Sequence, residues 1–335
     1  MRSHGDALSN AVHILAAALL AIAFDAAAPA APAARAESDY PSRTIRIIVP
    51  ISPGATADTL PRILAEKLTA KWGQPVVVEN RTGAALNIGA EIVARAAPDG
   101  YTLLATPPSP LTVNQSLYPN LAFDPSAFVP VTVIGESPNV LLVHPKPSLS
   151  SLQALIAFAK ANPNKLSYAS AGIGGTPQLS MELLKTLAGV QILEVPYRGL
   201  APALVDLLAG NVDMMFNNLG NALSPVANGQ LKALGVGSAK RVPALPDVPA
   251  IAETFPGFLS TTWFAIVAPP RTPPEIAEKL SSAIAEIVRQ PDVAAKFEAL
   301  STTPVGSSPA ATAALISEET ERWRKVIVAA GIKPE

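Results

Sequence analysis

The chain has 335 residues, 49% of them hydrophobic, and its 25 Lys and Arg nearly balance its 26 Asp and Glu. This length and apolar content favour a large core with room for two domains, and a net charge of −1 offers no electrostatic attraction to nucleic acid or to a membrane surface. The absence of cysteine excludes disulfides, a thiolate metal site and lipid attachment at an N-terminal cysteine.

The N-terminal segment has the features of a secretory signal peptide. Arg2 precedes an apolar run at 11–24, and an Ala- and Pro-rich stretch follows, ending in an A-x-A pattern at Ala36. A membrane anchor is the alternative, but the run is shorter than the roughly 20 apolar residues of a spanning helix, and Asp25 interrupts it. We therefore expect residues 1–36 to be cleaved near Ala36 and the product to be free in the periplasm.

The histidine count limits the chemistry that the mature chain can perform. His4 and His13 lie in the predicted signal peptide, so only His144 remains after processing. A histidine metal cluster is then impossible, and a Ser-His-Asp triad would have to use His144. This residue lies between an apolar strand and Pro145, and we interpret it as a structural residue at a strand end.

Strand patterns alternate with helix patterns along the mature chain, which predicts the α/β class, with parallel sheets and helical crossovers. A Pro-rich loop is expected at 106–110. The other elements expected in this first region are strands at 45–50, 75–79, 101–105 and 129–135 and helices at about 58–72 and 87–97.

A second run of the same kind begins at Val140. Its expected strands are 140–144, 166–169, 191–195, 212–216 and 231–236, and its helices are about 151–161, 176–188, 200–209 and 220–227. A strand at 263–268 and helices at about 273–289, 291–300 and 308–330 close the chain.

The simplest architecture for this order is two α/β lobes, with the last strand and helices returning to the first lobe. We assign residues 37–138 and the return at 260–335 to lobe 1, and residues 139–259 to lobe 2. Two strands that cross between the lobes, near 135–140 and 257–263, would form a hinge.

The first candidate site is the turn after the first strand, where Pro53-Gly54 opens a helix. A helix start leaves unpaired backbone N–H groups where the helix dipole favours negative charge. We expect the N–H groups around Gly54, Ala55 and Thr56 to hold a carboxylate. Alternatively, Asp58 is only an acidic residue in the first turn of the helix that interacts favourably with the helix dipole.

The second candidate is a glycine-rich loop that runs from Ser170 to Gly175 and opens another helix. Thr176 is placed to cap the helix that Pro177 begins, which makes a second anion-receptive helix start. The loop has neither the G-x-G-x-x-G fingerprint of dinucleotide sites nor the Lys of a phosphate P-loop, so a nucleotide is not expected. Tyr197 and Asp213 are either ligand contacts or ordinary strand-end residues.

Several ordered motifs of the mature chain resemble one family, the Bug/TctC-type periplasmic substrate-binding receptors of tripartite tricarboxylate transporters. The resemblance covers essentially the whole mature chain. Besides the Pro-Gly turn with Asp58, it rests on Val78-Glu79-Asn80-Arg81-Thr82-Gly83-Ala84, Ala97-Pro98-Asp99-Gly100-Tyr101-Thr102-Leu103-Leu104, Val195-Pro196-Tyr197-Arg198-Gly199, Leu245-Pro246-Asp247-Val248-Pro249 and Trp263.

The resemblance implies a type II periplasmic-binding-protein fold, whose two lobes close on a small organic acid, commonly a carboxylate. Family members grip the ligand through backbone groups and bridging waters of the first turn and the glycine-rich loop. The resemblance also implies membrane permease subunits as partners. We expect a monomer with no catalytic residue, no metal, no cofactor and no nucleic acid partner.

This chain departs from the family pattern at several positions around the predicted site. Ala55 stands where the family usually has a second Gly, Ile51 stands where it commonly has a Phe, and Gln178 stands where it often has a His. These departures favour a smaller, more apolar or aromatic acid, or an amide. Three further departures are that this chain has Ala85-Leu86 where the family has a glycine pair, Pro107-Pro108 where it has a polar pair, and Asn217 where it has an acidic residue.

The leading hypothesis is a solute receptor that delivers its ligand to a permease. Two alternatives stay open: a receptor that signals to a histidine kinase, and an exported hydrolase that uses Ser52 or Ser170. The predicted ligand-binding residues are Ile51, Pro53, Gly54, Ala55, Asp58, Ser109, Ser170, Gly174, Thr176, Gln178, Tyr197, Asp213 and Asn217.

Overall fold

The computed structural model describes residues 40–170, 172–197 and 199–332. The predicted signal peptide, with its cleavage site near Ala36, lies outside these residues, as do Ala171 of the glycine-rich loop and Arg198 of the quoted motifs. Among the described residues, no helix combines the length and apolar character that crossing a membrane requires.

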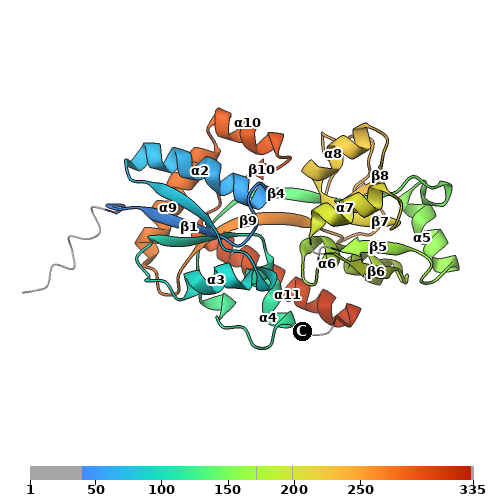
Figure 1. Ribbon diagram of the computed structural model, residues 1–335, viewed down its shortest axis with the longest axis horizontal. Coiled ribbons are helices and arrows are strands. Elements are labelled where there is room, and N and C mark those ends of the chain that lie inside the picture. Colours follow the sequence, from blue (N-terminus) through green and yellow to red (C-terminus); the bar gives the residue numbers. More distant parts are fainter. Residues whose placement is uncertain (1–39, 171, 198, 333–335) are drawn as a thin grey trace, which may run out of the picture. The chain divides into compact units, whose positions relative to one another are not determined.

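The first sheet has the strand order β2-β1-β3-β9-β4, and its first three strands are parallel (Figure 1). The strand β1 is apolar at almost every position because helices cover both faces of the sheet, with α2 on one side and α3 on the other (Figure 1). The strands are β1 (Ile45–Val49), β2 (Val76–Asn80), β3 (Thr102–Thr106), β4 (Val129–Val143) and β9 (Thr261–Ala268), and the helices are α2 (Thr56–Trp72), α3 (Asn87–Ala94), α9 (Pro274–Val288), α10 (Pro291–Ala299) and α11 (Pro309–Ala330).

The second sheet continues from the far half of β4, which pairs with β7 on one side and β8 on the other. The helices α5 and α6 pack on one face of this sheet, and α7 and α8 pack on the other. The elements are β5 (Ser167–Ser170), β6 (Leu193–Pro196), β7 (Met214–Asn218), β8 (Lys232–Val236), α5 (Leu152–Ala161), α6 (Thr176–Ala188), α7 (Leu200–Leu208) and α8 (Leu219–Ala227).

The strand β4 connects the two sheets. The sequence predicted two strands at 129–135 and 140–144, but the structure has one strand of 15 residues. Its residues up to Pro138 pair with β9, and those from Asn139 onward pair with β7 and β8. The strands β4 and β9 run between the sheets in opposite directions (Figure 1). The pairings of β4 with β7, β8 and β9 and of β3 with β9 are antiparallel, so both sheets are mixed, which corrects the expectation of parallel sheets.

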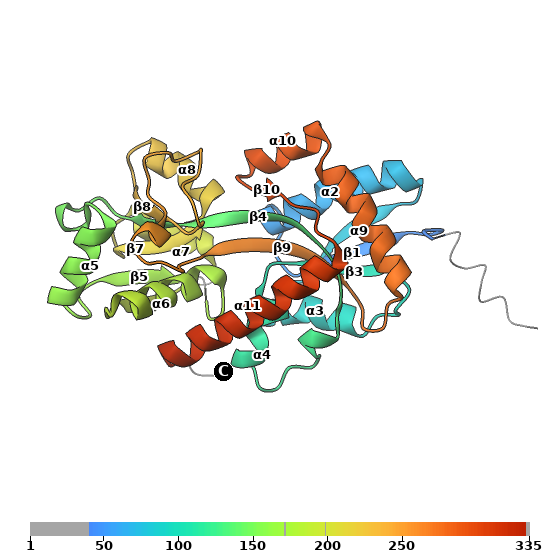
Figure 2. The ribbon, with the colours of Figure 1, turned by 180° about the vertical axis from the view of Figure 1, so that it is seen from behind.

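The lobe boundaries remain a prediction. Residues 41–335 cluster as one compact unit, so the division at residues 138 and 259 rests on the pairing of the strands alone. Part of the reason is α11, which runs past both sheets (Figure 2). Its last turns pack Trp323 and Ile327 against Val113 and Leu117 of the first region and Leu179 of α6.

The Pro-rich stretch predicted as a loop at 106–110 is helical in its second half. A π-helical turn, η2 (Ser109–Val113), leads directly into α4 (Asn114–Leu117). Proline is tolerated here because the N–H groups of a first helical turn need no partner within the helix. The remaining short elements are η1 (Ala84–Leu86), η3 (Pro125–Ala127), η4 (Pro147–Leu149), η5 (Ile251–Glu253) and β10 (Thr303–Pro304).

Candidate functional site

The predicted site residues cluster where parallel strands end. In the first sheet Ile48 pairs with Leu104, so the turn after β1 and the segment after β3 leave the same edge of the sheet. In the second sheet Ser170 pairs with Pro196, and this register places Tyr197 beside the end of β5. The carboxyl ends of parallel strands are where ligands bind in open α/β sheets.

The turn after β1 is fixed from inside the protein by Asp58. Its Oδ2 accepts the N–H of Gly54 at 2.9 Å, and its Oδ1 accepts Nδ2 of Asn80 at 2.7 Å. Asn80 Nδ2 also donates to the carbonyl of Ile51 at 2.8 Å, and Arg62 Nε donates to the carboxylate at 3.0 Å. The carboxylate therefore holds the two ends of the turn together and is directed into the protein.

The charge state of Asp58 follows from these contacts. Burial of the carboxyl opposes ionisation, but hydrogen bonds from Arg62, Asn80 and Gly54 outweigh it and hold the pKa below the ordinary value of 3.8. A carboxylate that is already paired in this way contributes little repulsion toward an anion outside the turn.

The outer side of this turn is open to solvent. Pro53, Gly54 and Ala55 are exposed, and Ile51 is half-buried. Gly54 has a φ of 88°, a conformation that favours glycine, and Ala55 is the N-cap of α2 without a side-chain cap. The first N–H groups of α2 thus have no acceptor within the helix and can receive an anion.

The glycine-rich loop is held differently from the sequence prediction. The helix α6 begins at Thr176 itself, and its N-cap is Gly175, so the predicted capping role of Thr176 is wrong. Gln178 takes over part of this role because its Oε1 accepts the N–H of Gly174 at 2.8 Å. Its Nε2 donates to Glu194 at 2.9 Å, which leaves the buried Gln178 side chain fully used in fixing the loop.

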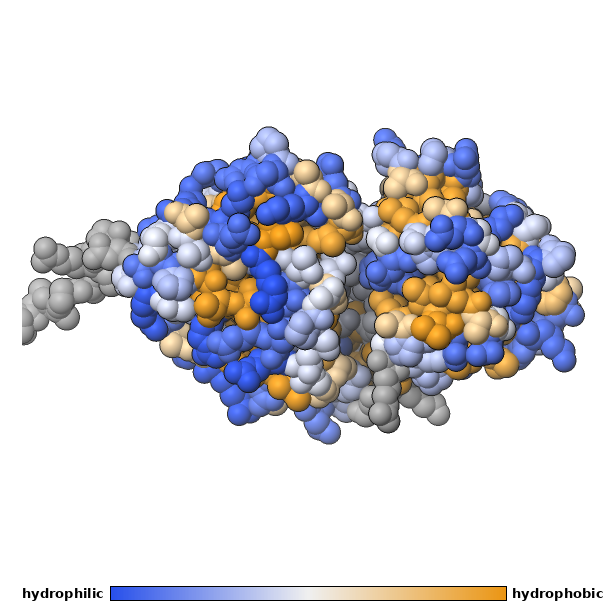
Figure 3. Space-filling model, turned by 45° about the horizontal axis from the view of Figure 1, so that its top comes forward, coloured by the Kyte–Doolittle hydropathy of each residue, from blue (hydrophilic) through white to orange (hydrophobic). Residues whose placement is uncertain are grey.

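The loop meets the first region of the chain at Ser109. The hydroxyl of this buried residue donates to the carbonyl of Gly174 at 2.9 Å, across 65 positions of sequence. Gly174 has a φ of 81°, and a Cβ there would lie 2.8 Å from Leu117 and 3.2 Å from Val113. Only glycine therefore allows the loop to approach so closely. The strand ends of the two sheets are joined at this contact, and Figure 3 shows the surface hollowed between the two groups of elements.

Four buried polar side-chain atoms in α4, β4, β5 and β7 have no hydrogen-bond partner among the described residues. Two belong to predicted site residues, Ser170 and Asn217, and two were not predicted. Buried polar atoms without a partner are uncommon and often mark a place for a ligand or water. The atoms are Ser170 Oγ, Asn217 Nδ2, Asn114 Oδ1 and Ser137 Oγ.

The structure does not bring Asp213 into this group. Asp213 lies before β7, at the opposite end of the strand from Asn217. Its Oδ1 accepts Lys146 Nζ at 2.6 Å, and its Oδ2 accepts the N–H of Ser167 at 2.8 Å. The position supports the alternative interpretation of a strand-end residue, because parallel strands present their ligand site at the other edge.

Tyr197 lies at the correct edge but has an internal partner. Its N–H donates to the carbonyl of Ser170 at 2.9 Å, and its hydroxyl donates to Asp206 at 2.6 Å. The hydrogen bond to this carboxylate raises the pKa of Tyr197 to about 12, with burial and the negative charge of Asp206 adding to the effect. The phenol is therefore neutral at neutral pH, and Asp206 of α7 fixes its position.

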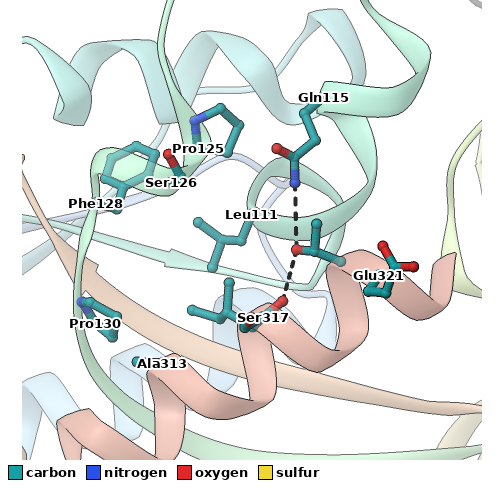
Figure 4. A pocket seen from close by; sticks show the side chains of 11 residues that line it. Leu111, Gln115, Pro125, Ser126, Phe128, Pro130, Ala313, Ser317 and Glu321 are labelled. Carbon is teal, nitrogen blue, oxygen red and sulfur yellow. Dashed lines mark hydrogen bonds between the residues drawn. The ribbon is translucent and has the colours of Figure 1, made fainter. Parts of the chain in front are cut away.

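One cavity lies away from these groups. It has a volume of about 480 Å³ and opens between α11 and the segment 111–130 (Figure 4). Gln115 and Thr320 meet across it with a 3.4 Å hydrogen bond, and Leu111, Phe128 and Ile316 form its apolar wall. None of the predicted ligand-binding residues lines it.

Two sheets joined by crossing strands, with a helix start beside the strand ends of each, form a two-lobed fold. Comparison with known proteins agrees. Residues 60–332 match the family described as "Tripartite tricarboxylate transporter family receptor". The protein BugT of Bordetella pertussis is 40% identical over 297 residues, which are 88% of this chain and 91% of BugT.

Solved structures give the same result. Rpa4515 of R. palustris with adipate is 36% identical, has a TM-score of 0.80, and is matched over 88% of this chain and 100% of its own. MatC (Rpa3494) from Rhodopseudomonas palustris with bound malate is 33% identical, has a TM-score of 0.76, and is matched over 86% and 100%. The chain belongs to the tripartite tricarboxylate transporter receptor family, whose members among these relatives are periplasmic binding proteins of the two-lobe type. The resemblance noted from the sequence is thereby confirmed.

Proposed function

We propose that this protein is a periplasmic receptor that captures a small organic acid between its two lobes and delivers it to the permease subunits of a tripartite tricarboxylate transporter. The Ser109–Gly174 hydrogen bond is the observation that carries the proposal, because it joins the strand ends of the two sheets. The adipate and malate in the two related structures support a carboxylate as the ligand class.

The acid would be held by dipoles more than by formal charges. Next to the exposed turn, the start of α2, a helix of 17 residues, offers backbone N–H groups, whereas the N–H of Gly54 itself is already bound to Asp58. Ser170 and Asn217 offer buried donors at the ends of β5 and β7. The strands β4 and β9, which cross between the sheets, would then form the hinge about which the lobes close.

Titration calorimetry of the purified protein with adipate, malate and a panel of mono-, di- and tricarboxylates, aromatic acids and amides tests the proposal. We expect saturable binding of at least one acid, and a smaller radius of gyration by X-ray scattering when it is bound. Correctly folded protein that binds no compound of the panel would overturn the proposal.

A further inference from the structure

Asn114 occupies a position between the two regions that meet at Gly174. It is fully buried, and it begins α4 directly after the π-helical turn that carries Ser109. No local sequence pattern marks it, because a lone Asn after Thr112 and Val113 has no distinctive spacing. Its amide nitrogen nevertheless makes two hydrogen bonds, to Ala85 and to Asn87.

The orientation of the Asn114 amide is fixed by its donors. Nδ2 donates to the carbonyl of Ala85 at 2.9 Å and to Oδ1 of Asn87 at 2.6 Å. The carbonyl of Ala85 can only accept a hydrogen bond, so turning the amide over would set Oδ1 of Asn114 against this carbonyl oxygen. Both hydrogens of Nδ2 are thus used, and Oδ1 must point the other way.

Oδ1 of Asn114 is a buried acceptor that has no partner among the described residues. A Cβ placed on Gly174 would lie 3.7 Å from it, so this oxygen faces the glycine-rich loop. The N–H and the carbonyl of Gly174 are already bound to Gln178 and Ser109, and its Cα–H is only a weak donor. A buried acceptor left in this state is unfavourable unless a donor reaches it.

We propose that Asn114 selects the ligand, and that the ligand presents a hydrogen-bond donor, a hydroxyl or an amide N–H, to Oδ1 of Asn114. The inference rests on the proposed function and adds to it a second chemical group of the ligand, a hydrogen-bond donor besides its carboxylate. Ser170 can donate to a carboxylate, and Asn217 Nδ2 can do the same, but the Oδ1 of Asn114 can only accept. A fully ionised acid has no donor for it, whereas a hydroxy acid or the half-amide of a diacid has one.

The test compares two pairs of probes that differ in this donor alone. Adipate is compared with adipamate, in which one carboxylate is an amide, and succinate is compared with malate, which carries a hydroxyl. We expect the donor-bearing member to bind about tenfold more tightly or better, which corresponds to about 1.4 kcal/mol. Calorimetry of the unaltered protein gives the ratio of the two dissociation constants of each pair without any variant.

Variants then assign the ratio to Asn114. In Asn114→Leu the ratio should fall to about one, while in Asn87→Ala, which removes one acceptor of Nδ2 and leaves Oδ1 in place, it should persist. A merely structural Asn114 would lower the melting temperature in both variants and leave the ratio of the two dissociation constants unchanged.

The outcomes separate this inference from the function on which it rests. Binding of adipate or succinate with equal or better affinity than the donor-bearing partner overturns the inference and leaves an acid receptor standing. Failure of all four probes and of the wider acid panel overturns the proposed function itself. Preference for the donor-bearing probes that is lost in Asn114→Leu supports both.

Discussion

The turn that opens α2 allows a sharp test through Asp58→Asn. The carboxylate accepts the N–H of Gly54, Nδ2 of Asn80 and Nε of Arg62, and the residue is only 2% exposed. Asparagine has nearly the same shape but replaces one acceptor oxygen with an NH₂ donor. In either orientation of the new amide, two donors would then face each other in a buried position.

The expected loss follows from the contacts. A hydrogen bond to a charged group contributes about 1.5–3 kcal/mol, and removal of one member of a buried ion pair costs about 3–5 kcal/mol. Arg62 is 45% exposed, so its share belongs at the low end of these ranges. We expect the free energy of unfolding at neutral pH to fall by about 3 kcal/mol.

The stability that the Asp58 carboxylate contributes should depend on pH in a defined direction. The pKa of Asp58 is lowered in the folded protein, because its hydrogen bonds to Arg62, Asn80 and Gly54 outweigh the opposing effect of burial. The stability that it contributes is therefore complete above the unfolded value of about 3.9 and is lost as the pH falls through the lower folded value. The difference between the wild type and Asp58→Asn should shrink below about pH 4.

Urea denaturation followed by circular dichroism, at neutral pH and at about pH 3.5, measures the difference. The matched control is Asp292→Asn, which removes a half-exposed carboxylate paired with Lys67 and should change stability by less than about 1 kcal/mol. A loss for Asp58→Asn no larger than that of the control, or one that stays the same at low pH, would refute the role assigned to the carboxylate. Tighter anion binding by Asp58→Asn would show that Asp58 faces the ligand.

Three further predictions concern the neighbouring segments. Gly174→Ala should weaken acid binding at least tenfold, measured by calorimetry, because its Cβ would lie 2.8 Å from Leu117; an unchanged affinity would show that the contact is not needed. Ala85→Gly should raise the free energy of unfolding by up to about 1 kcal/mol, seen as a higher urea midpoint, because Ala85 has a φ of 50°. A lower midpoint would contradict strain at this residue. Tyr197→Phe should remove from an ultraviolet titration a phenol whose pKa Asp206 raises to about 12, and loss of a phenol that titrates near pH 10 instead would contradict the assignment.

Local patterns gave most of the secondary structure. The helix predicted at 176–188 begins and ends as predicted, and α5, α7 and α11 begin or end within one residue of the expected positions. These segments have helical periodicity between clear turn residues, so nearest-neighbour chemistry is sufficient to place them. The strand β4 was divided in two because Gly135 and Pro138 are typical strand breakers, and only its pairing with β9 keeps it continuous.

The candidate site was predicted in its backbone parts and missed in its side-chain contacts. The turn at Gly54 and the glycine-rich loop carry turn residues that are visible in the sequence. The hydrogen bond from Ser109 to Gly174 and the contact of Asn114 with Ala85 join residues 65 and 29 positions apart, and no local pattern encodes them. The ion pair of Asp213 with Lys146 could not be predicted for the same reason, since the two residues lie 67 positions apart.

The left-handed turn before α3 connects the departures of this chain to its proposed specificity. Ala84, Ala85 and Leu86 have φ values of 44°, 50° and 74°, and such a conformation costs about 1–2 kcal/mol per residue that is not glycine. The turn persists because Asn114 binds the carbonyl of Ala85, and the same bond fixes the direction of the Asn114 amide. A glycine at position 85 would relieve the strain, but it would also let this carbonyl move and the amide rotate. The strained alanine and leucine thus hold one acceptor oxygen toward the glycine-rich loop, where the proposed ligand donor would meet it.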